Sequence, residues 1–538
     1  MLSILLNAAL WIPPILGYGA LFSNGGEAHL RRAVTGMLGL YALSVLGMVV
    51  HFFVPLGPMV STAVWLLGVL LFLRRRRWLI EGLSRWEYAG AAISLLALVL
   101  LMQPPGRLYD NGLYYLQAVK WASEQPIAIG LVNLYDRLAF NNSWFLVSAL
   151  LEHPLAAGES GWFVTLLPMA FVAAAAGAAA GRVAAGSRTF PDLAMAALFL
   201  PLAQATEGLG SSAADPVLAI LIPFILVLCA QALESTQRAE AEAAILLSIL
   251  AVTIKLSAAP LALGGIVLLI ALRRAWPARR LMVLAALAMV PWGLRSILLS
   301  GCLFYPVAST CIAGLSWTQD RADIRRLATW IQSWARHPGR PPEEVIGNWD
   351  WLSGSGSALL DRRDYLFLGA LIIAGLGALL ANARATTRSF AAAFAVALCG
   401  AIFWFLTAPD PRFGLGFLFA LALLPLAFAA SRARLFAAPR AGVVLGCALS
   451  ACAVCLLLTN DTLKLARQRP WPIPAVSWPL LPVARTVTRT TLSGFEVNIP
   501  VSGPRCWAAP LPCAPKFDPN LERDGAIMRS GQRDGTAR

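Results

Sequence analysis

The stretch AAISLLALVLLMQPPGRLYDNGLYYLQAVKW, residues 91–121, passes from an apolar run into an aspartate, four aromatic rings and an amphipathic pattern. The apolar part, with the residues before it, is close to the roughly 20 residues that cross a bilayer. Asp110 follows almost immediately, ahead of leucines at helical spacing. The side of the membrane on which Asp110 lies therefore decides what this segment can do.

The composition of the whole chain predicts a membrane protein. Of 538 residues, 58% are apolar and only 13% are charged, whereas soluble proteins carry charge nearer about 25%. The first run lacks a basic start and a small-residue cleavage site, so we expect a retained span. We predict an all-α, polytopic helix bundle of about 14 spans, in which the short runs around 244–272 form a broken pair. The runs lie near 2–22, 33–55, 57–73, 88–103, 161–181, 191–206, 216–233, 244–259, 260–272, 281–299, 365–381, 389–407, 413–430 and 441–459.

The basic residues predict the orientation of the spans. Clusters such as HLRR (29–32), RRRR (74–77) and RRAWPARR (273–280) fall on one side when spans are counted off, and basic loops stay in the cytoplasm. The net charge of +15 is thus explained by cytoplasmic loops, and we expect no nucleic-acid partner. The expected parts are N-terminal helices (1–87), a transmembrane core (88–459) with external loops 104–160 and 300–364, and an external tail (460–538).

Cysteine spacing supports this orientation independently. Cys302 with Cys311, and Cys506 with Cys513, form two close pairs on the side already predicted to be external. Disulfides persist in oxidising compartments such as the periplasm. We therefore predict two disulfides, with free loop thiols as the alternative.

Charged side chains gather at the external ends of the spans. An ionisable group at such a place is a candidate for function, and a mixture of carboxylates and cations suits an anionic lipid phosphate and an acid–base step. Simpler roles stay open: Asp215 before Pro216 suits a helix N-cap, and an arginine can extend to the interface. The set comprises Asp110, Glu207, Asp215, Lys255, Arg295, Asp410 and Arg412.

The external loops are rich in aromatic and amide side chains. NLYDRLAFNNSWF (133–145) is too polar to span, and WTQDRADIRRLATWIQSWARHP (317–338) has the pattern of an amphipathic helix. Such aromatic residues occur in sugar sites and in interfacial belts alike. No Walker A loop, HExxH or paired CxxC motif is present, and the histidines do not cluster. Expected substrate-lining residues are Tyr109, Tyr114, Gln117, Asn141 and Asn142; the histidines are His29, His51, His153 and His337.

Several short motifs together resemble the GT-C superfamily of polytopic glycosyltransferases. Family members place an acid in the first large external loop, as in YDNGLYYLQAVKW with Asp110. SSAADPVL with Asp215, IKLSAAPL with Lys255 and DPRFGLGF with Arg412 are similar to later family elements, as is PWGLRSILLSGCLFYP. The likeness covers roughly residues 88–430. The chain departs from the family in the roughly four spans that precede Asp110 and in a tail without a recognisable catalytic domain.

The resemblance implies an enzyme of the bacterial inner membrane and cell envelope, with both termini in the periplasm. It would transfer a sugar, with inversion, from a polyprenyl-phosphate donor to a glycan, lipid or protein acceptor. Asp110 would be the general base, on the cavity wall opposite Arg412 and about a sugar's width away. Donor phosphate would bind Arg412, Lys255 and Arg295; Asp215, Glu207 and Asp410 would form an acidic, acceptor or metal site, with a divalent cation as the one cofactor considered.

Three alternatives stay open at this point. A lipid-linked sugar flippase or other transporter would carry charges in the middle of several spans, whereas here they gather at one face. An O-antigen polymerase or ligase would use the same donors at that face. A non-catalytic assembly partner would retain the fold without the chemistry.

Overall fold

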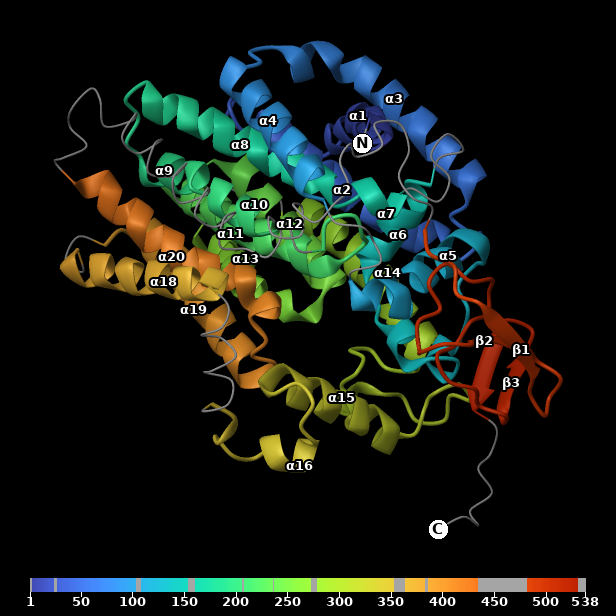
Figure 1. Cartoon of the computed structure of the whole chain (residues 1–538). Coiled ribbons are helices and arrows are strands. Elements are labelled where there is room, and N and C mark those ends of the chain that lie inside the picture. Colours follow the sequence, from blue (N-terminus) through green and yellow to red (C-terminus); the bar gives the residue numbers. More distant parts are fainter. Residues whose placement is uncertain are drawn as a thin grey trace.

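The protein is mainly helical (Figure 1). The computed structural model describes residues 2–23, 27–102, 108–152, 160–205, 208–235, 237–271, 278–352, 363–382, 386–433 and 481–530. Its longer helices are α1 (Leu2–Gly19), α2 (Arg31–Val50), α3 (Pro58–Ile80), α4 (Arg85–Leu101), α8 (Leu166–Ala184), α11 (Ala214–Ser235), α12 (Arg238–Ile254), α13 (Leu261–Ala271), α14 (Ala278–Ser300), α15 (Arg321–Arg336), α18 (Arg363–Ala381), α19 (Arg388–Thr407) and α20 (Pro411–Arg432).

Short helices connect these segments. They are the π-helix η2 (Asn111–Tyr115), α5 (Leu116–Glu124), η3 (Leu131–Asn133), η4 (Asp136–Ala139), α6 (Ser143–Leu150), α7 (Ser160–Phe163), α9 (Phe190–Ala196), α10 (Phe199–Gln204), η6 (Leu256–Ala258), η8 (Ala308–Thr310) and α16 (Pro342–Val345). The predicted break within 244–272 is present, because α12 ends before Lys255 and η6 separates it from α13.

Within the described residues, seven helical segments are long and apolar enough to cross a membrane, judged by length and composition. This confirms a mainly helical protein with several helices of membrane-spanning type; the count of fourteen spans stays a prediction. The predicted run 441–459 lies outside the described residues. The seven segments are Arg31–Val50, Pro58–Ile80, Ser160–Ala184, Ala214–Ser235, Arg279–Ser300, Arg388–Thr407 and Pro411–Arg432.

One apolar core joins the N-terminal helices to the rest of the bundle. Helices α8 and α11 are almost wholly buried, and α11 packs on α12, α19 and α20. Helix α2 packs on α6, α8, α12 and α14. By contrast, α3 and α14 expose rows of large apolar side chains, including Leu66, Leu70 and Val290. Such surfaces suit contact with lipid rather than water.

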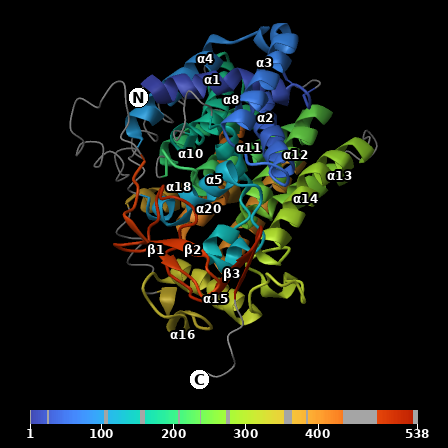
Figure 2. The same cartoon turned by 90° about the vertical axis from the view of Figure 1, so that its right-hand side faces the viewer.

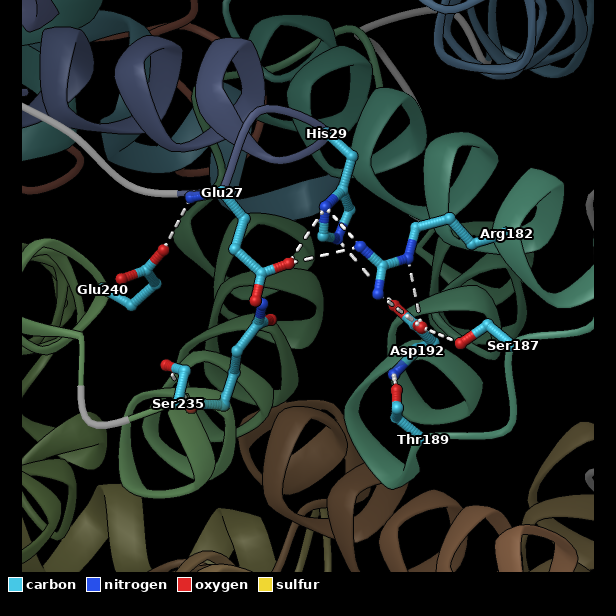
Figure 3. Close-up of polar contacts among 9 residues, drawn as sticks. Glu27, His29, Arg182, Ser187, Thr189, Asp192, Ser235 and Glu240 are labelled. Carbon is cyan, nitrogen blue, oxygen red and sulfur yellow. Dashed lines mark hydrogen bonds and ion pairs between the residues drawn. The ribbon is translucent and has the colours of Figure 1, made fainter.

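Ion pairs join the segments at the end of the bundle where α2 and α12 begin. Arg182 contacts Glu27 and Asp192, and the imidazole of His29 lies among all three (Figure 3). Nearby, the guanidinium of Arg32 pairs with the carboxylate of Glu87 at 2.5 Å. These residues belong to the loops predicted to be cytoplasmic.

Helix α12 fixes the distance between the two ends of the bundle. Its first turn carries Glu240, which accepts a hydrogen bond from the backbone N–H of Glu27. Its last residue precedes Lys255, which lies at the opposite end. Seventeen helical residues span about 25 Å at 1.5 Å each, so the ends are well separated.

The C-terminal segment contains strands, so the all-α prediction is wrong there. Two antiparallel hairpins form from β1 (Thr486–Thr490) with β2 (Glu496–Pro500), and from β3 (Leu521–Asp524) with β4 (Ile527–Ser530). In the first hairpin Thr486 faces Pro500, and in the second Leu521 faces Ser530. Both views place the strands, α15 and α16 at one end of the molecule (Figures 1 and 2).

The C-terminal strands do not stand alone, because their segment packs on the residues that follow Asp110. The side-chain amide of Gln117 donates to the carbonyl oxygens of Trp507 and Ala509, both at 3.0 Å. The N–H of Trp507 donates to the carbonyl of Gly112, where a β-carbon would lie only 2.6 Å from the indole ring. Glycine is therefore required at position 112 for this close approach.

Two further features were predicted correctly. The amphipathic segment at 317–338 contains α15, which buries Ile324 and Leu327 on one face. Both predicted disulfides are present, Cys302–Cys311 and Cys506–Cys513.

Candidate functional site

A cavity of about 710 Å³ lies where α11 and α20 begin and α12 ends, beside α15 and the segment from Tyr109 to Phe145. Four of the sequence-predicted charges, Asp110, Asp215, Lys255 and Arg412, line it together. The other lining residues are Tyr109, Leu113, Tyr114, Tyr115, Tyr135, Arg137, Phe140, Asn141, Asn142, Phe145, Ala214, Ile254, Leu256, Ser257, Trp292, Ser296, Tyr305, Pro306, Trp330, Ile331, Trp334, Trp404, Thr407, Ala408, Phe413 and Pro504.

Local backbone structure places each charge at the end of a helix. Asp110 is the N-cap residue of η2, and Asp215 lies in the first turn of α11. Lys255 follows the last turn of α12 in extended conformation. Arg412 lies in the first turn of α20, where Asp410 is the N-cap and accepts a hydrogen bond from the Arg412 N–H. Charges at these positions keep the helix interiors apolar.

The charges form three ion pairs, two of which share Arg412. Arg412 Nη1 lies 3.6 Å from Asp110 Oδ2, and Arg412 Nε lies 3.6 Å from Asp410 Oδ2. Lys255 pairs with Asp215. The ring of Phe413 separates the two cations: the Lys255 ammonium is 3.8 Å, and the Arg412 guanidinium carbon 4.8 Å, from its centroid.

The predicted separation of Asp110 and Arg412 across the cavity is wrong. We expected a gap the width of a sugar, whereas the two side chains are in ion-pair contact at 3.6 Å. Opposite charges that line one cavity attract each other, and pairing offsets the cost of removing them from water.

The remaining predicted residues divide between the cavity and other places. Tyr109, Tyr114, Asn141 and Asn142 line the cavity, whereas Gln117 is bonded to the C-terminal segment and is not part of the lining. Asp410 supports Arg412 from outside the lining.

Two predicted residues have no described place in this cavity. Arg295 of α14 is buried outside the lining and lies close enough to His51 to help burial lower the pKa of that imidazole to about 3. Glu207 lies outside the described residues.

Several lining residues were not predicted. Arg137 of η4 lies over the ring of Trp330, 4.6 Å from its centroid, and Arg412 lies 4.9 Å from the centroid of Trp334. The two tryptophans are one turn apart on α15, so they face the same side of that helix. Because 317–338 was predicted to be helical, the four-residue spacing of Trp330 and Trp334 could have indicated that both tryptophans line the same surface.

Burial affects the ionisable groups around the cavity. It raises the pKa of the phenols of Tyr114, Tyr135 and Tyr305, which therefore stay protonated as hydrogen-bond donors. Burial also raises the pKa of Asp410, an effect that Arg412 opposes. Among the described residues, no group of three or more His, Cys, Asp or Glu side chains lies close enough to hold a metal ion.

Fold and site together define a multi-helix protein of membrane type with an aromatic, charged cavity at one end of the bundle. The family described as "Domain of unknown function (DUF8201)" matches residues 1–419, and the chain belongs to that family. No curated protein and no solved structure matches the chain.

Proposed function

We propose that the protein is an inverting membrane glycosyltransferase that takes a sugar from a polyprenyl-phosphate donor at the periplasmic face. The observation that carries the proposal is the convergence of Asp110, Arg412 and the Asp215–Lys255 pair in one cavity with apolar and aromatic walls. The motif resemblance to the GT-C superfamily supports it. A lipid-linked sugar needs both an apolar path for its chain and charges for its phosphate and for proton transfer.

In the proposed reaction Asp110 is the general base. The acceptor hydroxyl oxygen forms a bond to the anomeric carbon as the bond from that carbon to the phosphate oxygen breaks. Asp110 takes the hydroxyl proton, and polyprenyl phosphate leaves with the bonding electron pair. One displacement inverts the anomeric centre. The Asp110 side chain is 16% exposed, so its carboxylate is accessible to an acceptor in the cavity.

The cations nearest the base would act on developing charge. Arg412 and Lys255, the phosphate ligands predicted from sequence, flank Phe413 beside Asp110 and Asp215. Preorganised positive groups stabilise negative charge that appears on a leaving oxygen. Asp215 and Asp410 would hold these cations in place, and a divalent cation at this acidic side remains part of the proposal.

The aromatic walls fit the sugar itself. Trp292, Trp330 and Trp334 all line the cavity. The flat apolar face of a pyranose can pack on such rings, while the hydroxyl groups of the sugar form hydrogen bonds with other side chains. The amide side chains of Asn141 and Asn142 supply nearby hydrogen-bonding groups.

The positions of the charges favour this reaction over transport. Asp110, Asp215, Lys255 and Arg412 belong to helix starts or ends at one end of the bundle. A transporter places its charges near the midplane, on a path open alternately to both sides.

The test is transfer of label from a radiolabelled polyprenyl-phosphate sugar in membranes that contain the protein and cell-envelope acceptors. Asp110→Asn should lower the rate by about 10²–10⁴-fold, because the amide keeps the shape but does not accept the proton. The same assay with a chelator added tests whether transfer needs a divalent cation. No label transfer by the wild type, or full activity in the asparagine variant, would remove this proposal.

The proposed orientation has its own test. Reporter fusions at Arg76 should be cytoplasmic, and fusions at Asp361 and Asp518 should be periplasmic, since basic loops are retained in the cytoplasm. A cytoplasmic fusion at Asp518 would place the cavity on the wrong side for periplasmic donors.

A further inference from the structure

The cavity lining contains one cation that no carboxylate pairs with. Lys255 and Arg412 have carboxylates within 4 Å, namely Asp215 for the first, and Asp110 and Asp410 for the second. Arg137 is the third lining cation, and no carboxylate of the described residues lies within 4 Å of it. Among the lining cations, Arg137 is therefore the unpaired one.

The neighbouring Asp136 forms no salt bridge with the Arg137 guanidinium. Its Oδ1 atom is buried without a hydrogen-bond partner, and its hydrogen bond with Arg137 is through the backbone N–H.

The guanidinium of Arg137 keeps its hydrogen-bond donors available. It lies over the face of Trp330, with its central carbon 4.6 Å from the ring centroid. Stacking uses the face of the planar group, whereas its N–H donors point outward in the plane. Those donors match the oxygens of a phosphate in a bidentate way.

The hydroxyl group of Tyr305 is a second hydrogen-bond donor in the same cavity. Tyr305 lines the cavity, is only 5% exposed, and its hydroxyl is buried without a hydrogen-bond partner. Arg137 is close enough to act electrostatically on this phenol. A buried hydroxyl without a hydrogen-bond partner is unfavourable unless a ligand satisfies it.

We propose that Arg137 and the Tyr305 hydroxyl form a subsite for one singly charged phosphate group carried on an apolar chain. One unpaired cation suits a singly charged phosphodiester, and Leu113, Phe140 and Ile331 offer apolar lining for the chain. Arg412, already in contact with Asp110 and Asp410, keeps the role that the proposed function gives it, so Arg137 is an additional phosphate ligand and does not replace it. Naming the ligand as the sugar donor rests on the proposed function; the subsite itself does not.

The test measures binding of a short-chain polyprenyl methyl phosphate, a singly charged phosphodiester, to the purified full chain, followed by tryptophan fluorescence. Arg137→Gln should raise the Kd at least about tenfold, the loss expected for a charge-assisted hydrogen bond. Arg137→Lys should fall between, and Tyr305→Phe, which keeps the ring packing, should raise the Kd a few-fold. Affinity for the matched uncharged polyprenol should not change in any variant.

Controls separate this subsite from its neighbours. Arg523→Gln removes an exposed arginine that stacks on Phe495 outside the cavity lining, and it should bind the probe as the wild type does. Competition by inorganic phosphate at Arg137 would assign the subsite to free phosphate; no competition assigns it to the lipid-linked group.

The outcomes distinguish this inference from the proposed function. Arg137-dependent binding without any sugar transfer would keep the subsite and remove the transferase. The subsite is overturned if the wild type does not bind the probe. It is also overturned if Arg137→Gln and Tyr305→Phe keep wild-type affinity, or if transfer proceeds in Arg137→Gln with an unchanged donor KM.

Discussion

Two arginines at opposite ends of the bundle, Arg32 and Arg412, differ in how completely the protein satisfies their hydrogen-bond donors. Arg32 donates to both carboxylate oxygens of Glu87 and to the carbonyls of Leu79, Glu81 and Gly82. Arg412 lies 3.6 Å from Asp110 and from Asp410, and its Nε has no hydrogen-bond partner. The Arg32 guanidinium links neighbouring helices, whereas the Arg412 guanidinium faces a cavity.

The difference separates a structural ion pair from an available one. A buried charge whose donors are all used holds its partners in one arrangement, and its loss leaves the partner charge stranded. A charge with long contacts and an open side can respond to a ligand. The sequence predicted a cytoplasmic loop for Arg32 and the candidate site for Arg412, but it did not show how completely either guanidinium is bonded, because both lie at the start of an apolar helix.

The largest stability effect should come from Glu87→Gln. It leaves the Arg32 charge buried without its counter-charge, which costs about 3–5 kcal/mol, seen as a large fall in the thermal midpoint in one detergent. The double variant Arg32→Met with Glu87→Leu should recover most of that loss, since an apolar pair can replace a buried salt bridge. Equal losses in both variants would mean that the pair itself is not the cause.

Arg412→Lys should lower the rate of sugar transfer by about tenfold, because lysine keeps the charge but loses the planar fork that reaches Asp110 and Asp410. Its unfolding midpoint should stay close to that of the wild type. A rate as low as that of Asp110→Asn would instead make the fork essential to the base.

Asp110→Asn should change stability by less than about 1 kcal/mol, the range for partly exposed ion pairs. The readout is the same thermal midpoint used for Glu87→Gln. If the loss equalled that of Glu87→Gln, Asp110 would belong to the structural class, and its effect on transfer would need another explanation.

The smallest effect concerns His29 in the network of Figure 3. Burial and Arg182 lower the pKa of its imidazole below 6.5, consistent with Nδ1 lying 2.9 Å from Arg182 Nη1. Below that pH the unfolded state binds a proton that the folded state does not, so stability falls as pH falls. Comparing unfolding midpoints at pH 7.5 and 5.5, His29→Gln should show a smaller drop than the wild type.

The sequence predicted the helical membrane class, the broken pair around Lys255, the helix α15 and both disulfides, because apolar length, periodicity and cysteine spacing are local signals. It also predicted that Asp110, Asp215, Lys255 and Arg412 lie together. The contact between Asp110 and Arg412 was missed, since span order fixes a membrane face but not a distance. Arg137 was missed because its importance comes from Trp330, which lies far away in sequence.

The strands of the C-terminal segment had no sufficient local signal. TVTRT and EVNIP are only five residues each, and two-stranded hairpins are marginal alone. Their stability comes from packing on the residues after Asp110, including Met528 against Ile129. Patterns within the segment do not contain that partner.

Pro504 lines the cavity, so the final wall of the site is translated very late. Gln117 and its partner Trp507 are 390 residues apart, which at about 5–20 residues per second means roughly 20–80 s of elongation. During that interval the side-chain amide of Gln117 lacks the carbonyl oxygen of Trp507, to which it donates in the complete structure. The last part of the cavity wall is therefore added only after the ribosome has passed residue 507. By then the helices that form the rest of the charged, aromatic cavity have already been synthesised.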